Sequence, residues 1–211
     1  MNDTTRNLQV PLSECEVRDL RLGDVVTISG RVFTGRSLFH IRAVEENILP
    51  PINFDELNCF FHVGPVMRET EPGWEVVSIE PTSSIRFERY GGPVVRKLGL
   101  RALIGKTTMG PGTAEALRDV GGVHLTKIGI CGNLLRQHVI RVVDVFFLEE
   151  LGKTEATWVF EVEHFGLFFV DIDARGNNYF RDLDKRTRQR LRDVYDELGI
   201  PQDFTYTEVN P

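Results

Sequence analysis

Cationic and hydroxyl-bearing residues follow three apolar segments of the sequence, at the point where each segment ends. Arg36 follows Thr34-Gly35, Arg86 ends the run Pro81-Thr82-Ser83-Ser84-Ile85-Arg86, and Lys106 precedes Thr107-Thr108. Two arginines and a lysine brought together would bind a small polyanion, because arginine offers a planar fork to a carboxylate and helix-start amides add donors. The pattern therefore predicts a focused anion pocket.

Each of these residues also has a purely structural interpretation. Arg36 and Arg86 would be solvated surface cations, Thr82–Ser84 a helix cap, and Lys106 a surface residue after an edge strand. The occurrence of all three groups at strand exits favours the pocket, because strand ends of layered α/β folds converge on a binding crevice.

Two phosphate-binding signatures are missing from the sequence. Gly105-Lys106-Thr107 is similar to the end of a nucleotide-binding loop, but position 100, where that motif requires glycine, is Leu. No Gly-x-Gly-x-x-Gly run occurs. Neither nucleotide hydrolysis nor dinucleotide chemistry is favoured.

The three cysteines, Cys15, Cys59 and Cys131, stand far apart, and no CxxC pair occurs. This spacing excludes a zinc ribbon or a thioredoxin-type motif. Three thiolates could hold an iron–sulfur cluster with one open iron, but ligand cysteines usually cluster locally. The spacing favours ordinary thiols and predicts that the chain itself binds no metal.

Composition and charge narrow the function classes further. The 211 residues include 25 Lys and Arg against 31 Asp and Glu, a net charge of −6, which argues against general nucleic-acid binding. No apolar stretch approaches the ~18 residues of a membrane span. The N-terminus has no basic-then-apolar signal pattern, so a cytoplasmic location is predicted.

Apolar segments and turn residues alternate along the chain and predict its elements. Strands are expected over 25–33, 58–63, 74–79, 101–105, 123–128 and 139–148, with a loop over 66–73. Helices are expected over 37–48, after the hydroxyl cap at 82–84, from Pro93 to Leu98, over 110–120 and over 181–198. A hairpin is expected from 157–163 and 167–173, turning at His164-Phe165-Gly166.

These elements predict an α/β protein, with a mixed sheet and helical cover in layers. The last helix is amphipathic, and its expected inner face carries Leu183, Thr187, Leu191, Val194 and Leu198. Three parts are expected: an N-terminal arm over 1–20, a layered domain over 21–180, and a C-terminal helix and tail over 181–211.

Several ordered blocks resemble one protein family from about Leu20 to about Phe180. The blocks are Thr34–His40, similar to the family's "TxRDxAH"; His62–Pro65, similar to "YxGP"; Pro81–Arg86, similar to "PTTxxRM"; Leu103–Lys106, similar to "xIGKGG"; and Trp158–Glu163 with Asp171–Phe180, similar to its ending. The sequence resembles the β subunit, or C-terminal domain, of the iron–sulfur hydro-lyases, class I fumarate hydratase and L(+)-tartrate dehydratase.

The resemblance implies a swivelling β/β/α domain that works with a separate α subunit. That subunit would carry the 4Fe-4S cluster on its own cysteines, and the active site would be shared between the two chains. The implied activity is a hydro-lyase reaction, the reversible addition or removal of water on a small 2-hydroxy dicarboxylate of the fumarate/malate or tartrate type. No nucleic-acid or membrane partner is implied.

The resemblance also implies a role for each matched residue. Arg36 and Arg86 would bind substrate carboxylate, with Ser83 beside them, and Lys106 would add a positive donor to binding and catalysis. Thr82 would match the hydroxyl residue that moves the proton on the substrate carbon.

The sequence departs from the family pattern at several positions. Thr107-Thr108 replace the family's glycine pair, Ser37 replaces its Asp, Phe87 replaces its Met, and the helix over 181–198 lies beyond the match. Side chains at 107 and 108 would crowd an approach that glycine leaves open. An alternative therefore stays open: a noncatalytic anion-binding or regulatory module that kept the fold.

Overall fold

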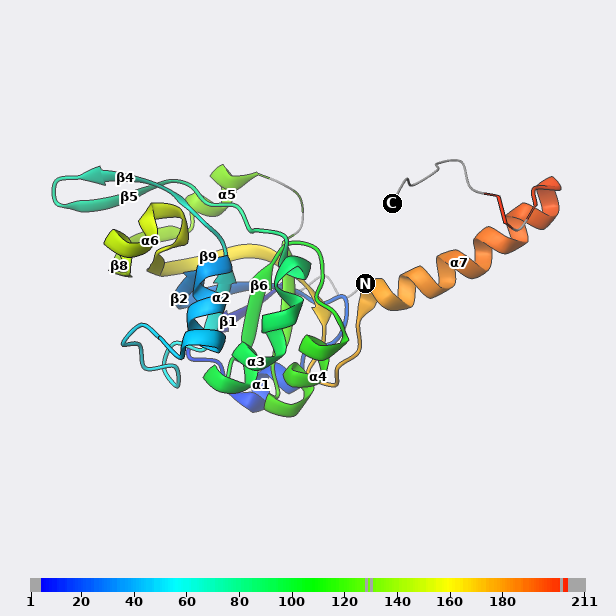
Figure 1. The fold of residues 1–211 in the computed structure, drawn as a ribbon, viewed down its shortest axis with the longest axis horizontal. Coiled ribbons are helices and arrows are strands. Elements are labelled where there is room, and N and C mark those ends of the chain that lie inside the picture. Colours follow the sequence, from blue (N-terminus) through cyan, green and yellow to red (C-terminus); the bar gives the residue numbers. More distant parts are fainter. Residues whose placement is uncertain (1–4, 128, 130, 202, 205–211) are drawn as a thin grey trace. The chain divides into compact units, whose positions relative to one another are not determined.

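The computed structural model describes residues 5–127, 129, 131–201 and 203–204 (Figure 1). The chain divides into two compact units: the first ends at Asn178 and the second begins at Tyr179. The strands of the first unit are β1 (Arg6–Gln9), β2 (Val25–Gly35), β3 (Cys59–His62), β4 (Val66–Thr70), β5 (Gly73–Ser78), β6 (Ala102–Gly105), β7 (Val123–Lys127), β8 (Val139–Phe146) and β9 (Thr157–Ile172). Its helices are α1 (Glu14–Arg18), α2 (Ser37–Ile41), the π-helical η1 (Arg42–Glu46), the 3₁₀ turn η2 (Ser84–Phe87), α3 (Glu88–Leu98), α4 (Pro111–Val120), α5 (Gly132–Arg136) and α6 (Leu148–Glu155). The second unit contains α7 (Tyr179–Leu198).

Seven of the described strands form one mixed sheet in the order β1-β2-β3-β6-β7-β9-β8. The neighbours from β1 to β7 pair in parallel, whereas β9 runs antiparallel to β7 and β8. Strand β9 also pairs with β2, so β2, β3, β6, β7 and β9 close into a ring. The predicted α/β class with a mixed sheet and helical cover is confirmed.

Successive side chains of the central strands enter two different cores, as the period of two in a strand requires. Phe61 joins the core that also holds Cys59 and Trp158, on one face of the sheet. Phe60 joins the second core, between the sheet and helices α2, α3 and α4, which cover the other face in Figure 1. Residues buried on both faces explain the continuous apolar runs in the sequence.

The prediction of a hairpin that turns at 164–166 is wrong, because β9 is one continuous strand of 16 residues. It pairs with β2 along its length, from Val25 opposite Phe169 to Phe33 opposite Val159. The irregular segment is absorbed as register shifts, with His164 at φ 49°. Pairing along the whole of β2 stabilises β9 as one strand more than the turn residues at 164–166 favour a reversal, and β-bulges accommodate those residues.

Three other local expectations are corrected. Residues 66–73 are not a loop: β4 forms a hairpin with β5, anchored by buried Met67. The helix expected over 37–48 divides into α2 and the π-helical turn η1. Finally, α3 is a single helix that contains Pro93, and Gly91 and Gly92 let it approach α4 closely.

The described part of the expected arm, residues 5–20, contributes both to the sheet and to the core. Strand β1 pairs with β2, and Leu8, Leu12, Val17 and Leu20 are buried. The division of the chain at residues 20 and 180 stays a prediction.

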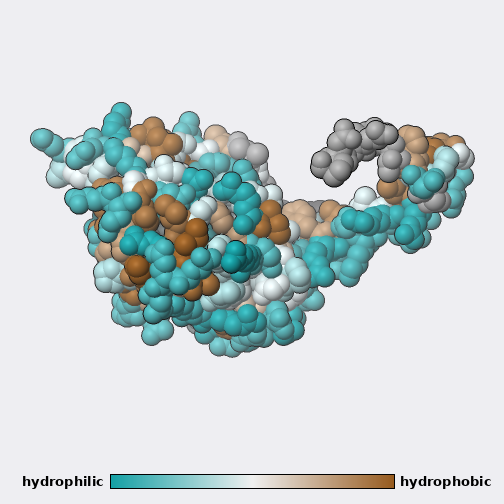
Figure 2. Space-filling view, viewed as in Figure 1, coloured by the Kyte–Doolittle hydropathy of each residue, from teal (hydrophilic) through white to brown (hydrophobic). Residues whose placement is uncertain are grey.

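Helix α7 confirms the helix expected over 181–198, but the expected inner face is not buried. Its described residues include no buried side chain, and Leu183, Leu191 and Leu198 are 43%, 46% and 68% exposed. The face of α7 that Figure 2 shows is mostly hydrophilic. None of the helices formed by the described residues is both long and apolar enough to cross a membrane.

Candidate functional site

Arg36 stands where β2 ends and α2 begins, and two neighbours fix its side chain. Glu155, at the end of α6, places Oε1 3.7 Å from Arg36 Nε and accepts a hydrogen bond from the Leu38 amide at 3.0 Å through Oε2. A Cβ on Gly64 would lie only 2.6 Å from Arg36 Cδ. Gly64 therefore gives Arg36 the room to pass the end of β3, and Glu155 orients it.

The segment that carries Thr82 lies across the ends of two parallel strands. Pro81 bridges to Val63, and the Thr82 amide donates to the His62 carbonyl at 2.7 Å, just beyond β3. On its other side Ser83 bridges to Lys106, at the end of β6. The segment is thus held by backbone contacts on both sides.

Lys106 and Arg86 are the two cations without a carboxylate partner among the described residues of this site. Lys106 follows β6 directly and is partly exposed, and its neighbour Thr107 places Oγ1 3.3 Å from Ser83 Oγ. Arg86 is exposed on η2 and lies 5.5 Å from the centroid of the Phe87 ring. Their positive charge remains available to an anion.

The structure therefore brings the predicted residues to one edge of the sheet. Strands β2, β3 and β6 are parallel neighbours, and their C-terminal ends meet at the same edge. We call the residues Arg36, Thr82, Ser83, Arg86 and Lys106 the strand-end site. Their individual roles stay predictions.

The hydroxyl cap expected at 82–84 is wrong. Turn η2 begins after Ser83 without a side-chain hydrogen bond to its amides. Ser84 is fully buried instead, and its Oγ lies 3.0 Å from His62 Nδ1. The hydroxyl finds a tertiary partner that no local pattern contains.

A set of buried histidines behind the site was missed by the sequence analysis. His62 Nε2 lies 3.1 Å from His40 Nε2, and His124 Nδ1 donates to Asp171 Oδ1 at 2.6 Å. Burial lowers the pKa of His40 to about 3. Burial, and then the nearby His40 and His124, hold the pKa of His62 well below its usual value. The only signal of this set in the sequence was His62, a polar residue directly after the apolar run 59–61.

The cysteines do not fit a cluster site. Cys59 is buried in β3, whereas Cys15 on α1 and Cys131 at the start of α5 are exposed. Among the described residues, no three His, Cys, Asp or Glu side chains are grouped to hold a metal ion. Burial also raises the pKa of the Cys59 thiol.

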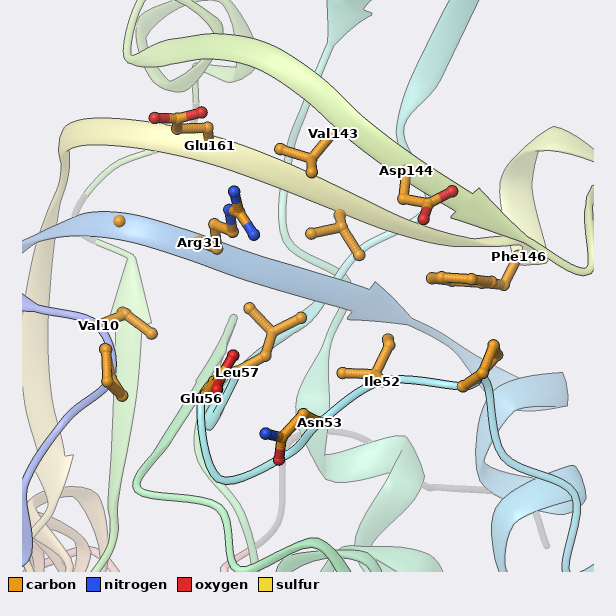
Figure 3. A pocket seen from close by; sticks show the side chains of 14 residues that line it. Val10, Arg31, Ile52, Asn53, Glu56, Leu57, Val143, Asp144, Phe146 and Glu161 are labelled. Carbon is orange, nitrogen blue, oxygen red and sulfur yellow. The ribbon is translucent and has the colours of Figure 1, made fainter.

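A cavity of about 620 Å³ lies elsewhere, between β2, β8, β9 and residues 51–57 (Figure 3). Ile52, Leu57 and Phe146 give it apolar walls, and its charged lining is one arginine, Arg31, and three carboxylates, those of Glu56, Asp144 and Glu161. None of its lining residues belongs to the strand-end site.

Comparison with known proteins shows the family of the chain. The profile of a family described as "Fumarase C-terminus" matches residues 2–183, most of the chain. The chain belongs to this family. The family match covers all strands of the sheet and ends within α7.

Individual relatives within the fumarase C-terminus family are similar over most of this chain. L(+)-tartrate dehydratase subunit beta of Escherichia coli K12 is 33% identical over 193 residues, covering 90% of this chain and 94% of that protein. A protein of Methanocaldococcus jannaschii assigned as the same subunit is 32% identical over 186 residues, 87% of this chain and 95% of that one. A protein of Geobacillus stearothermophilus assigned as class I fumarate hydratase is 37% identical over 185 residues, 87% of this chain but 35% of that longer protein.

Proposed function

We propose that this chain is the β subunit of a hydro-lyase that adds or removes water on a small 2-hydroxy dicarboxylate. The observation that carries the proposal is the strand-end site, where Arg86 and Lys106 have no carboxylate partner among the described residues. The family membership and the names of the relatives support the same conclusion.

The residues of the strand-end site divide the work by their chemistry. Arg36 and Arg86 bind carboxylate through planar forks, and Lys106 adds a compact positive charge. These cations stabilise the negative charge that builds as the substrate carbon loses its proton. Thr82 accepts that proton, a role open to a hydroxyl only where nearby cations favour its ionised form. Ser83 donates a further hydrogen bond to the substrate.

An α subunit completes this enzyme and carries the iron–sulfur cluster, because the cysteines of this chain do not fit that group. Exposed apolar side chains border the site and support such a partner: Leu38 beside Arg36, Val66 after β3 and Ile85 beside Arg86 are 37%, 57% and 46% exposed. Apolar side chains gathered around a charged site are typical of a covered interface. The cytoplasmic location stays a prediction.

Anaerobic co-expression with an adjacent α-subunit gene tests the proposal directly. The assembled protein is screened for hydration or dehydration of fumarate, malate and tartrate, with cluster content checked by its absorbance. Turnover of at least one substrate is expected. An intact cluster without turnover of any of them contradicts the proposal.

One observation favours the alternative of a noncatalytic anion-binding module. Thr107 adopts φ 66°, a conformation that suits glycine, and its Oγ1 donates to the Lys106 carbonyl. Its side chain therefore stands beside the cation that the reaction needs. Calorimetric titration of the chain alone with dicarboxylates separates the two: tight binding without a partner favours the module, whereas binding only in the assembly favours the enzyme.

A further inference from the structure

Three buried polar side chains connect the segments that carry the strand-end site. His40 follows Arg36 on α2, His62 ends β3, and Ser84 follows Thr82, and all three are 0% exposed. His62 contacts both of the others, His40 through Nε2 at 3.1 Å and Ser84 Oγ through Nδ1 at 3.0 Å. The Arg36 and Thr82 segments are therefore joined beneath the site as well as at its surface.

A second buried pair faces the same place from β7 and β9. His124 and Asp171 are both 0% exposed and lie 2.6 Å apart. A Cβ on Gly105 would lie 1.7 Å from Ser84 Oγ and 3.3 Å from His124 Nε2, so both atoms face the space that this glycine leaves open. Lys106 is the next residue, so the third segment of the site borders this space.

One arrangement of protons gives the buried N–H groups of His40 and His62 the most complete set of hydrogen-bond acceptors. In it His40 Nε2–H donates to His62 Nε2, and His62 Nδ1–H donates to Ser84 Oγ. His124 Nε2 borders the same space and has no hydrogen-bond partner among the described residues. The reverse order would leave a buried N–H at His40 Nδ1 with no acceptor in the described structure. Buried N–H groups without acceptors are rarer than unpaired acceptors.

We propose that the buried histidine chain, defined as His40, His62, Ser84, His124 and Asp171, is the positioning element of the strand-end site. The cations of the site repel one another, so buried contacts must hold their backbone segments in place when no substrate is bound. Ser84 is the central positioning residue, because it contacts His62 and fills the space at Gly105. The catalytic consequence rests on the proposed function, whereas the proton order and the tie between segments do not.

The proton order is tested on the full chain with ¹⁵N-labelled histidine by long-range ¹H–¹⁵N correlation. His62 is expected as the neutral Nδ1–H tautomer and His40 as the neutral Nε2–H tautomer throughout pH 5–8. A titrating His62, or His62 as the Nε2–H tautomer, overturns the proposal without any variant.

The tie between segments is tested with Ser84→Ala and a matched control, Ser29→Ala. Ser29 is also a buried serine of the first unit, and its Oγ contacts Asn7 Oδ1 and the His164 amide, each at 3.0 Å. Only Ser84→Ala is expected to change the His62 signals and to speed amide exchange in peptides 80–88 and 103–109. Equal effects of the two variants there would show a general loss of stability and overturn the proposal.

Kinetics of the assembled enzyme give the catalytic readout. Misplaced groups slow the chemical step more than they weaken binding, so Ser84→Ala is expected to lower kcat about 10- to 100-fold with a smaller change in KM. Ser29→Ala is expected to leave both unchanged. An active parent enzyme whose kcat is unaffected by Ser84→Ala contradicts the positioning role. An inactive parent enzyme contradicts the proposed function alone, and the spectroscopic and exchange results still decide the inference.

Discussion

The strand-end site and the cavity of Figure 3 lie in the same unit but differ in the sign of the charge that their side chains carry. In the cavity, Arg31 stands among three carboxylates, those of Glu56, Asp144 and Glu161, and Glu161 accepts a hydrogen bond from Arg141 at 2.6 Å. At the strand ends, Arg86 and Lys106 have no carboxylate partner among the described residues. The cavity is lined by more carboxylates than cations, whereas the charged residues of the strand-end site, Arg36, Arg86 and Lys106, are all cations.

This difference shows that shape alone does not identify the chemistry of this chain. A hollow that is lined mainly by carboxylates and apolar side chains offers no positive field in which negative charge could develop on a substrate. Unbalanced cations at the ends of parallel strands offer such a field, and they gain from a partner that excludes water. Four predictions test the comparison.

The largest effect is expected at Arg86. Arg86→Ala removes a charge-assisted contact of about 1.5–3 kcal/mol, which lowers kcat/KM about 10- to 150-fold. Steady-state kinetics of the assembled enzyme measure it. Arg86→Lys is expected to restore only part of the loss, because a point charge cannot reproduce the planar fork. Unchanged kinetics for Arg86→Ala would remove this residue from the site.

Acid is expected to destabilise the fold through the histidines beneath the site. The folded-state pKa of His40 is about 3 and that of His62 is also lowered by burial, whereas an unfolded histidine has a pKa near 6.5. The unfolded chain therefore takes up protons first, so this stabilisation is complete above about pH 6.5 and is lost as the pH falls toward about 3. Each histidine contributes a slope of about 1.4 kcal/mol per pH unit in that window.

Urea unfolding at several pH values measures this slope, with His40→Phe as the comparison variant. Phe keeps the ring that stacks on Phe87 at 4.8 Å but cannot take up a proton. The variant is expected to show a shallower dependence between pH 6.5 and pH 5. The same slope in both proteins would show that His40 does not carry the effect.

A smaller effect is expected at Glu155, which orients Arg36. Glu155→Gln keeps an acceptor for the Leu38 amide but removes the charge 3.7 Å from the guanidinium. Poorer orientation of Arg36 is expected to weaken substrate binding by about 0.5–1 kcal/mol, which raises KM about 2- to 5-fold with kcat nearly unchanged. A large fall in kcat with constant KM would instead place Glu155 in the proton transfer.

The smallest effect is expected at the cavity. Arg31→Ala is expected to change kcat/KM by less than about twofold, because exposed substitutions away from a site cost little. The same assay that measures Arg86→Ala measures this variant. A tenfold loss at Arg31 would break the comparison and make the cavity part of the functional site.

Local patterns in the sequence predicted much of the fold and of the site. The apolar segments at 25–33 and 101–105 became strands β2 and β6, and the helix over 181–198 became α7. The cations after those strands could be named because the ends of buried strands are visible in a single sequence. Strand β4 and the single helix α3 were missed, because Met67 and Gly91 owe their places to packing against distant elements.

By itself, the sequence determined the alternation of strands and helices, the family, and which cations stand at strand ends, since periodicity and motifs are properties of neighbouring residues. Only the tertiary structure decided that β9 runs through its turn signal and that Ser84 points to His62 instead of capping a helix. It also decided that Glu155 reaches Arg36 from α6. The physical reason is that the partners in each of these contacts lie far apart in the chain, so no local pattern records the interaction that fixes them.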